Sequence, residues 1–173
     1  IYCLGAAKQG MHSLPRSIAA LFFMLILASC SGEDPKIVNA QHLQRAMSYQ
    51  DTGQYKAAII EYRNAIKTSG GALEAVVQYA DMLNEIGRFP VALGLLEQVS
   101  GDKNEKFNFE LVETFIGLRK FKSAEAVLDE LGPENSVDKR LLKAKILSGL
   151  GKFDESQAIY EQVLNLDAQN GIA

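Results

Sequence analysis

Side chains suited to covalent or metal chemistry are few in this sequence, and most lie near its start. The cysteines are Cys3 and Cys30, and the histidines are His12 and His42. No cysteine follows Cys30, so the chain beyond it offers no disulfide and no thiolate metal site, and His42 alone cannot complete a zinc site. The sequence also lacks a P-loop and a nucleophile elbow. We therefore expect no metal, no cofactor, no small-molecule substrate and no catalysis.

The charged residues point to a binding surface rather than to acid–base chemistry. Neighbouring carboxylates at 129–130 and 154–155 fall where helix surfaces and helix N-termini are expected, so they favour water or the helix dipole as partners. The segment from Cys30 onward carries all 21 acidic residues and 16 of the 18 basic ones, a formal charge of −5. A mildly acidic domain gives no electrostatic reason to expect nucleic-acid binding.

Cys30 is the one thiol whose surroundings suggest a reaction. Residues 11–29 begin with the weakly basic His12 and Arg16, continue with an unbroken apolar run at 18–27 and end in two small residues. This order is typical of a secretory signal peptide. An apolar run of ten residues is too short for a membrane-spanning helix, which needs about 20, so a permanent transmembrane anchor is the weaker alternative.

The four residues that end this segment resemble the bacterial lipobox: Leu27, Ala28, Ser29 and Cys30. The resemblance implies that Cys30 carries a diacylglycerol and a further acyl chain, which together make a stable membrane anchor. Ser31 after the cysteine implies sorting to the periplasmic face of the outer membrane. The alternative is that Cys30 merely ends an ordinary signal peptide. We expect residues 1–10 to be a non-native or over-extended leader and residues 30–36 to be a lipidated tether.

From residue 37 to 170 the sequence predicts helices that are interrupted by regularly recurring breaks. Similar short segments lie at 53–55, 87–89, 119–121 and 151–153. Their spacing resembles that of the tetratricopeptide repeat (TPR), a helix–turn–helix unit of about 34 residues. The resemblance implies an all-α TPR α-solenoid of about four units, at 39–72, 73–104, 105–136 and 137–170, with 171–173 beginning a truncated next unit. An unrelated helical bundle is the alternative.

Small and large side chains alternate where the two helices of each unit would meet. The small ones are Ala46, Ala80, Val112 and Ala144 in the first helices, and Ala58, Ala92, Ala124 and Ser156 in the second. An aromatic residue follows each turn, and we expect it to fill the space between the helices of its own unit: Tyr55, Phe89, Phe121 and Phe153. Glycine at 53, 87 and 151 suits a helix C-terminus. We expect Gly117 to take over at the third turn, where Arg119 replaces glycine, by shifting that turn.

The TPR resemblance also implies that partners bind a concave wall made by the first helices. Its lining would lie one turn before and after the small residue of each first helix, at Leu43, Met47, Gln50, Val77, Asp81, Asn84, Phe109, Glu113, Ile116, Leu141, Lys145 and Ser148. Leu43, Val77, Phe109 and Leu141 could equally be core. The set lacks the Lys/Arg–Asn clamp of chaperone-tail-binding TPRs. We therefore expect an extended or helical protein segment as the partner.

The run from Ala46 to Ala65 and the segments 119–131 and 149–153 resemble the TPR-repeat lipoproteins of the PEP-CTERM/exosortase system. The resemblance implies an outer-membrane-anchored scaffold for exopolysaccharide assembly or export, or for PEP-CTERM protein sorting. One alternative is an accessory lipoprotein for outer-membrane protein insertion or type IV pilus assembly. An alternative of another class is the docking arm of an enzyme whose catalytic domain lies beyond residue 173.

Overall fold

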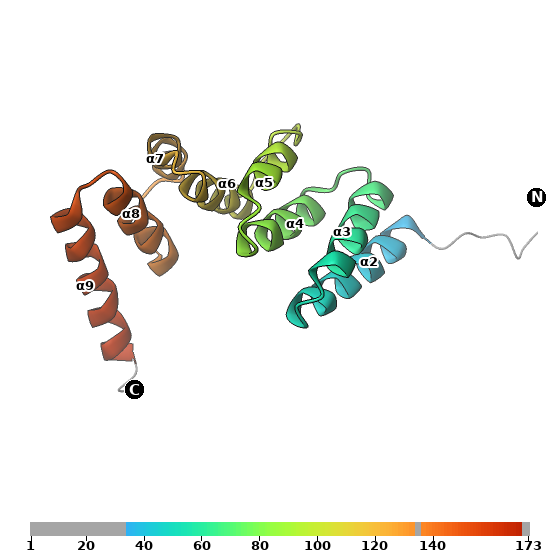
Figure 1. Cartoon of the computed structure of the whole chain (residues 1–173), viewed down its shortest axis with the longest axis horizontal. Coiled ribbons are helices and arrows are strands. Elements are labelled where there is room, and N and C mark those ends of the chain that lie inside the picture. Colours follow the sequence, from blue (N-terminus) through green and yellow to red (C-terminus); the bar gives the residue numbers. More distant parts are fainter. Residues whose placement is uncertain (1–33, 134–135, 171–173) are drawn as a thin grey trace, which may run out of the picture. The chain divides into compact units, whose positions relative to one another are not determined.

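The computed structural model of the chain describes residues 34–133 and 136–170, which form eight α-helices and no strand. The predicted signal peptide, Cys30 and residues 171–173 lie outside these described residues. The helices, labelled as in Figure 1, are α2 (Pro35–Asp51), α3 (Tyr55–Thr68), α4 (Leu73–Glu85), α5 (Phe89–Leu96), α6 (Glu105–Gly117), α7 (Phe121–Glu130), α8 (Val137–Gly149) and α9 (Phe153–Asn170).

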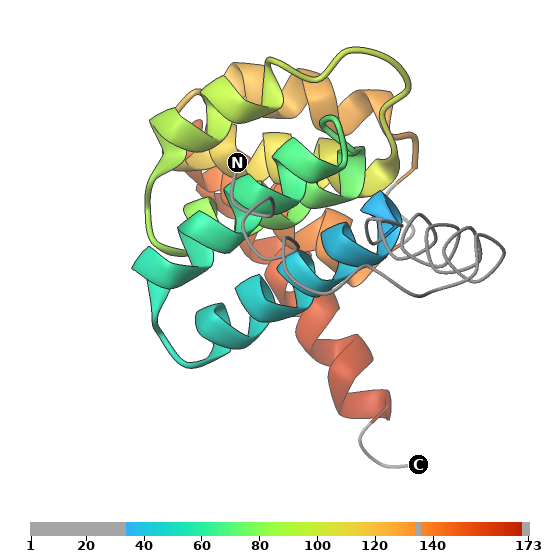
Figure 2. The same ribbon diagram turned by 90° about the vertical axis from the view of Figure 1, so that its right-hand side faces the viewer.

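These helices form four successive hairpins, whose first helices are α2, α4, α6 and α8 and whose second helices are α3, α5, α7 and α9. In each hairpin the two helices lie side by side (Figures 1 and 2). Each second helix also contacts the first helix of the next hairpin, and α6 contacts both α4 and α8. Hairpins that pack only on their neighbours make an α-solenoid, so the predicted fold class is confirmed. The first helices α4, α6 and α8 begin at residues 73, 105 and 137, where the second, third and fourth units were predicted to begin.

The turn inside each hairpin is the same helix-ending structure, although its sequence varies. At all four turns the backbone N–H just before the second helix donates to a carbonyl in the last turn of the first helix, for example Lys120 to Phe115 at 2.8 Å. The residue before that donor has a positive φ, which is 71° at Gly87 and 56° at Arg119. Glycine adopts such a φ without strain, whereas arginine does so at a cost. The expectation that Gly117 would shift the third turn is therefore wrong, because Arg119 itself takes the left-handed conformation.

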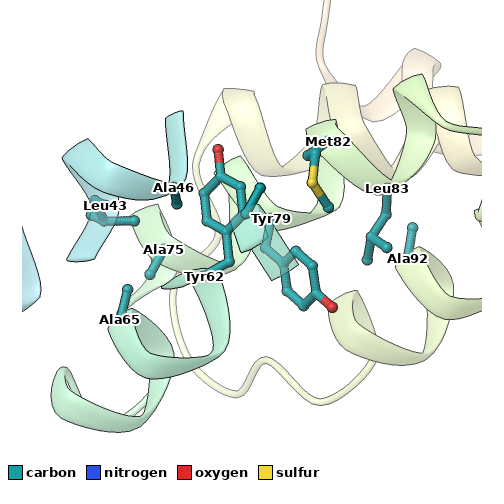
Figure 3. Close-up of a cluster of buried hydrophobic side chains, with 10 residues drawn as sticks. Leu43, Ala46, Tyr62, Ala65, Ala75, Tyr79, Met82, Leu83 and Ala92 are labelled. Carbon is teal, nitrogen blue, oxygen red and sulfur yellow. The ribbon is translucent and has the colours of Figure 1, made fainter. Parts of the chain in front are cut away.

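The small residues bring the helices of each hairpin together as predicted. Ala46 and Ala58 of the first hairpin are both 0% exposed, and so are their counterparts in the next two hairpins. Ser156 takes this place in the fourth hairpin and donates its hydroxyl to the Ala144 carbonyl at 2.9 Å. The first two hairpins share one buried cluster, shown in Figure 3, in which the Tyr62 and Tyr79 rings stack with centroids 5.5 Å apart.

The aromatic residues after the turns connect neighbouring hairpins. A Cβ placed on Gly117, the last residue of α6, would lie 2.3 Å from the Phe89 ring of α5, and one on Gly149 would lie 2.2 Å from the Phe121 ring. Each ring therefore lies directly against a glycine at the end of the next first helix. Phe121 also packs on a buried cluster that contains Val112, Ala124 and Leu128 of its own unit, so its ring fills the predicted space and contacts the next unit as well. Phe153 is 67% exposed.

Candidate functional site: a groove on the first helices

The first helices α4, α6 and α8 enclose a groove of about 550 Å³. Its lining comes from three successive hairpins. Within each helix, the lining residues are mostly three or four positions apart, because such side chains lie on the same face of a helix. The lining residues are Asp81, Asn84 and Glu85 of α4, Phe109, Glu110 and Glu113 of α6, and Asp138, Leu141, Leu142 and Lys145 of α8. Carboxylates and apolar side chains therefore share one concave surface.

Glu110 is the most perturbed carboxyl of the groove. Burial raises its pKa to about 7, and the negative charges of Asp81 and Glu113 act in the same direction. Asn84 Nδ2 donates to Glu110 Oε2 at 3.1 Å and partly opposes the shift. Near neutral pH, Glu110 therefore exchanges between a charged and a neutral form while its position is held by Asn84.

A buried polar contact holds Asn84 in place. Thr114 is 0% exposed, and its hydroxyl lies 2.9 Å from Asn84 Oδ1 and 2.7 Å from the Glu110 carbonyl oxygen. Asn84 Nδ2 also donates to that carbonyl at 3.2 Å. With both ends of its amide occupied, Asn84 joins the second hairpin to the third and orients the Glu110 carboxyl.

A second polar network holds the α4 end of the groove. Glu85 accepts hydrogen bonds from Tyr55 Oη at 3.0 Å and from Gln50 Nε2 at 2.8 Å, so residues of the first hairpin fix its carboxylate. The Tyr62 hydroxyl donates to Gln50 Oε1 at 2.7 Å, and burial raises the pKa of Tyr62 to about 12. Burial also raises the pKa of Asp81, with the Glu85 charge contributing, although a Gln50 hydrogen bond lowers it. The carboxylates of the groove therefore affect one another across hairpins.

Lys145 is the one basic side chain among the described residues that line the groove, and its Nζ lies 2.7 Å from Glu113 Oε1. Both side chains keep contact with water, with 46% of Lys145 and 37% of Glu113 exposed. This pair joins α6 to α8 and leaves Asp81, Glu85, Glu110 and Asp138 without a basic neighbour in the lining.

The structure brings together half of the twelve residues predicted to line a groove: Asp81, Asn84, Phe109, Glu113, Leu141 and Lys145. Leu43 and Val77 are buried, so of the two alternatives that the sequence left open for them, core or groove, both belong to the core. Gln50 does not line the groove but donates a hydrogen bond to Glu85, which does. Met47 is 48% exposed on α2, and Ile116 and Ser148 are partly buried, but none of these three contributes to the lining.

Sequence reasoning missed Glu85, Glu110, Asp138 and Leu142. Glu85 follows Asp81 by one helical turn, and Asp138 precedes Leu141 by about one turn. Extending the helical periodicity a further turn would have found both. Glu110 and Leu142 each adjoin a predicted lining residue, which shows that the groove face is wider than one stripe.

The groove has no arrangement suited to a metal ion. In the described part of the chain, no group of three His, Cys, Asp or Glu side chains could hold one.

A helix long and apolar enough to cross a membrane is not found within residues 34–133 and 136–170.

Comparison with known families identifies the repeats. A sequence profile for the tetratricopeptide repeat matches residues 42–70, which span most of α2 and α3, and residues 140–170, which span most of α8 and α9. The chain therefore contains tetratricopeptide repeats, and such repeats generally form non-catalytic scaffolds that bind other proteins. Searches of curated proteins and of solved structures gave no significant match.

Proposed function

We propose that this protein is a scaffold that binds a segment of a partner protein in the groove of α4, α6 and α8. The groove itself carries the proposal, because its volume of about 550 Å³ is spread over three hairpins and Phe109 and Leu141 offer apolar contact beside the carboxylates. A ligand site typically combines apolar lining with a few placed polar groups. An elongated surface of this kind suits an extended or helical segment.

A photo-crosslinking amino acid at Asp138, an exposed residue of the groove, tests this proposal in cells that make the full-length protein. The matched control carries the same amino acid at Lys56, an exposed residue of α3 that does not line the groove. We expect defined crosslinked partners from position 138 and not from position 56. Equal crosslinking at both positions, or none at either, would contradict the proposal.

We further propose that lipid on Cys30 holds this scaffold at the periplasmic face of the outer membrane. Its role there would be in exopolysaccharide assembly or export, or in PEP-CTERM protein sorting. The support is the resemblance of residues 27–30 to the lipobox and of the repeats to PEP-CTERM-system lipoproteins. Polysaccharide synthesis or export proteins among the crosslinked partners would support this role. Barrel-assembly or pilus components would replace it with the accessory-lipoprotein alternative and leave the groove as the binding site.

A further inference from the structure

We infer that the groove of α4, α6 and α8 selects a positively charged protein segment that also carries an apolar side chain. This inference rests on the proposed function and specifies the chemistry of the partner. Two features of the lining carry it: an excess of carboxylates gathered from three hairpins, and an apolar strip of Phe109, Leu141 and Leu142 beside them.

The charge argument starts from the lining residues. Five of them are acidic and one is basic. The basic residue, Lys145, forms an ion pair with Glu113, with 2.7 Å between Nζ and Oε1. The partners of Glu85 are the neutral Tyr55 and Gln50, whose hydrogen bonds orient its carboxylate without cancelling the charge. The lining therefore keeps a net negative charge in a concave, partly water-excluded place, where the field of several like charges adds up.

The negative charges of the groove carboxylates also raise one another's pKa values. The charge of Glu85 contributes to raising the pKa of Asp81, and the charges of Asp81 and Glu113 contribute to raising that of Glu110. A Lys or Arg side chain entering the groove would relieve this repulsion, because an opposite charge favours the ionised carboxylate. An acidic segment, or the free carboxyl end of a chain, would increase the repulsion.

The apolar strip favours a segment that carries an apolar side chain over a segment that carries only charged ones. Phe109 and Leu141 are only partly buried, so they offer apolar surface inside the groove, and Leu142 belongs to the buried cluster against which Phe109 packs. An apolar side chain placed there removes both surfaces from water, which is favourable in proportion to the area covered. Lys or Arg on either side of that side chain would reach the carboxylates of α4 and α8. The structure thus favours a short basic–apolar–basic pattern.

A labelled peptide panel tests the inference on the full-length protein by fluorescence anisotropy at pH 8 and low salt. The probe peptide carries Lys-Leu-Lys within a Gly/Ser sequence, with both ends blocked, and its matched relatives carry Glu-Leu-Glu or Lys-Ser-Lys. We expect the Lys-Leu-Lys peptide to bind at least about tenfold more tightly than Glu-Leu-Glu, because each exposed ion pair contributes up to about fivefold. It should also bind about fivefold more tightly than Lys-Ser-Lys. Added salt should weaken its binding.

Variants locate the binding. Asp81→Asn combined with Asp138→Asn removes two charges of the groove while keeping the shape of the side chains, and we expect about tenfold weaker binding of Lys-Leu-Lys. The matched control combines Glu97→Gln with Glu130→Gln, two exposed residues outside the lining, and should change binding less than about twofold. Circular dichroism verifies that each variant remains helical.

The outcomes separate this inference from the proposed function. Equal binding of Lys-Leu-Lys and Glu-Leu-Glu, or equal effects of the groove and control variants, would overturn the inference. A partner that crosslinks from position 138 through an acidic or uncharged segment would also overturn it while leaving the proposed function intact. Selective peptide binding in the groove, without any partner crosslinked in cells, would support the charge selectivity and count against the proposed function.

Discussion

Replacing Gly117 by alanine should weaken the stacking of the second hairpin on the third. The added Cβ would lie 2.3 Å from Cδ1 and Cε1 of Phe89. Carbon atoms in favourable contact are about 3.5–4.0 Å apart, so the ring has to move by more than about 1 Å. The close atoms include Cγ, at 2.5 Å, so they belong to the body of the partly buried ring, which has to shift as a whole.

The size of the effect follows from two opposing contributions. Alanine stabilises a helix over glycine by about 0.5–1 kcal/mol, less near a helix end. Overpacking a tight contact typically costs about 1–3 kcal/mol. We therefore expect Gly117→Ala to lower the free energy of unfolding by about 1–2 kcal/mol. Gly94→Ala is the matched control, because a Cβ on that helical glycine of α5 meets nothing within 4 Å, and it should raise the free energy of unfolding by about 0.5–1 kcal/mol.

Urea unfolding followed by far-ultraviolet circular dichroism measures both variants. The double variant Phe89→Leu with Gly117→Ala tests the cause, because a smaller and more flexible side chain makes room for the new methyl group. In a double-mutant cycle the two changes should be coupled by about 1–2 kcal/mol. The reasoning would be refuted if Gly117→Ala moved the urea midpoint upward as Gly94→Ala does, or if the cycle showed no coupling.

Three further outcomes can be checked. Ala58→Leu, which places a large side chain at a 0% exposed contact of α2 and α3, should cost about 1–3 kcal/mol of stability, whereas Ala126→Leu at an exposed site of α7 should leave the melting temperature nearly unchanged; equal effects would contradict the repeat register. The pKa of Glu110 is raised from 4.5 to about 7 on folding. Its ionisation therefore lowers the free energy of unfolding by the full amount above about pH 7, and this loss disappears below about pH 4.5. Glu110→Gln should therefore stabilise the protein by about 2 kcal/mol at pH 8, a value reduced from the full shift because the carboxyl keeps some contact with water, and by nearly nothing at pH 4; the same gain at both pH values would argue against this origin. Cys30→Ala should release the protein from membranes in its native host while Cys3→Ala should not, as followed by sedimentation, and retention of the Cys30→Ala protein would contradict lipidation.

Much of the fold could be predicted because the repeat is encoded locally. The small residues Ala46 and Ala58 and their counterparts recur at fixed positions, and each marks a close approach of two helices that are neighbours in sequence. The turns were predictable where glycine is present, as at Gly87. The third turn was not, because Arg119 adopts a positive φ of 56° that its residue type disfavours, and the surrounding hydrogen bonds decide the outcome.

The contacts between hairpins were the part that sequence periodicity could not supply. Phe89 and Phe121 were assigned to their own units, yet each packs on a glycine that ends the first helix of the following unit. Gly117 was explained by a turn, whereas its role is to leave room for a ring. The aromatic and the glycine belong to different repeats, so no pattern within one unit relates them.

The candidate groove shows the same division. Helical periodicity placed Asp81, Phe109, Glu113 and Leu141 on one face of their helices without the structure, because side chains one turn apart share a face. It could not separate them from Val77, which occupies a similar position but is 7% exposed in the core, since burial depends on the neighbouring hairpin.

The sequence by itself determined the helical class, the length of the repeat and the places where paired helices meet, because these depend on residues within about one unit of each other. Only the tertiary structure decided which carboxylates gather in one groove. Asp81, Glu110 and Asp138 belong to three different hairpins, and they share a surface because each hairpin stacks on the next. The rotation of one hairpin against another is set by contacts such as Phe89 on Gly117 and Asn84 on Glu110, and such packing between units determines the charge and shape that a partner meets.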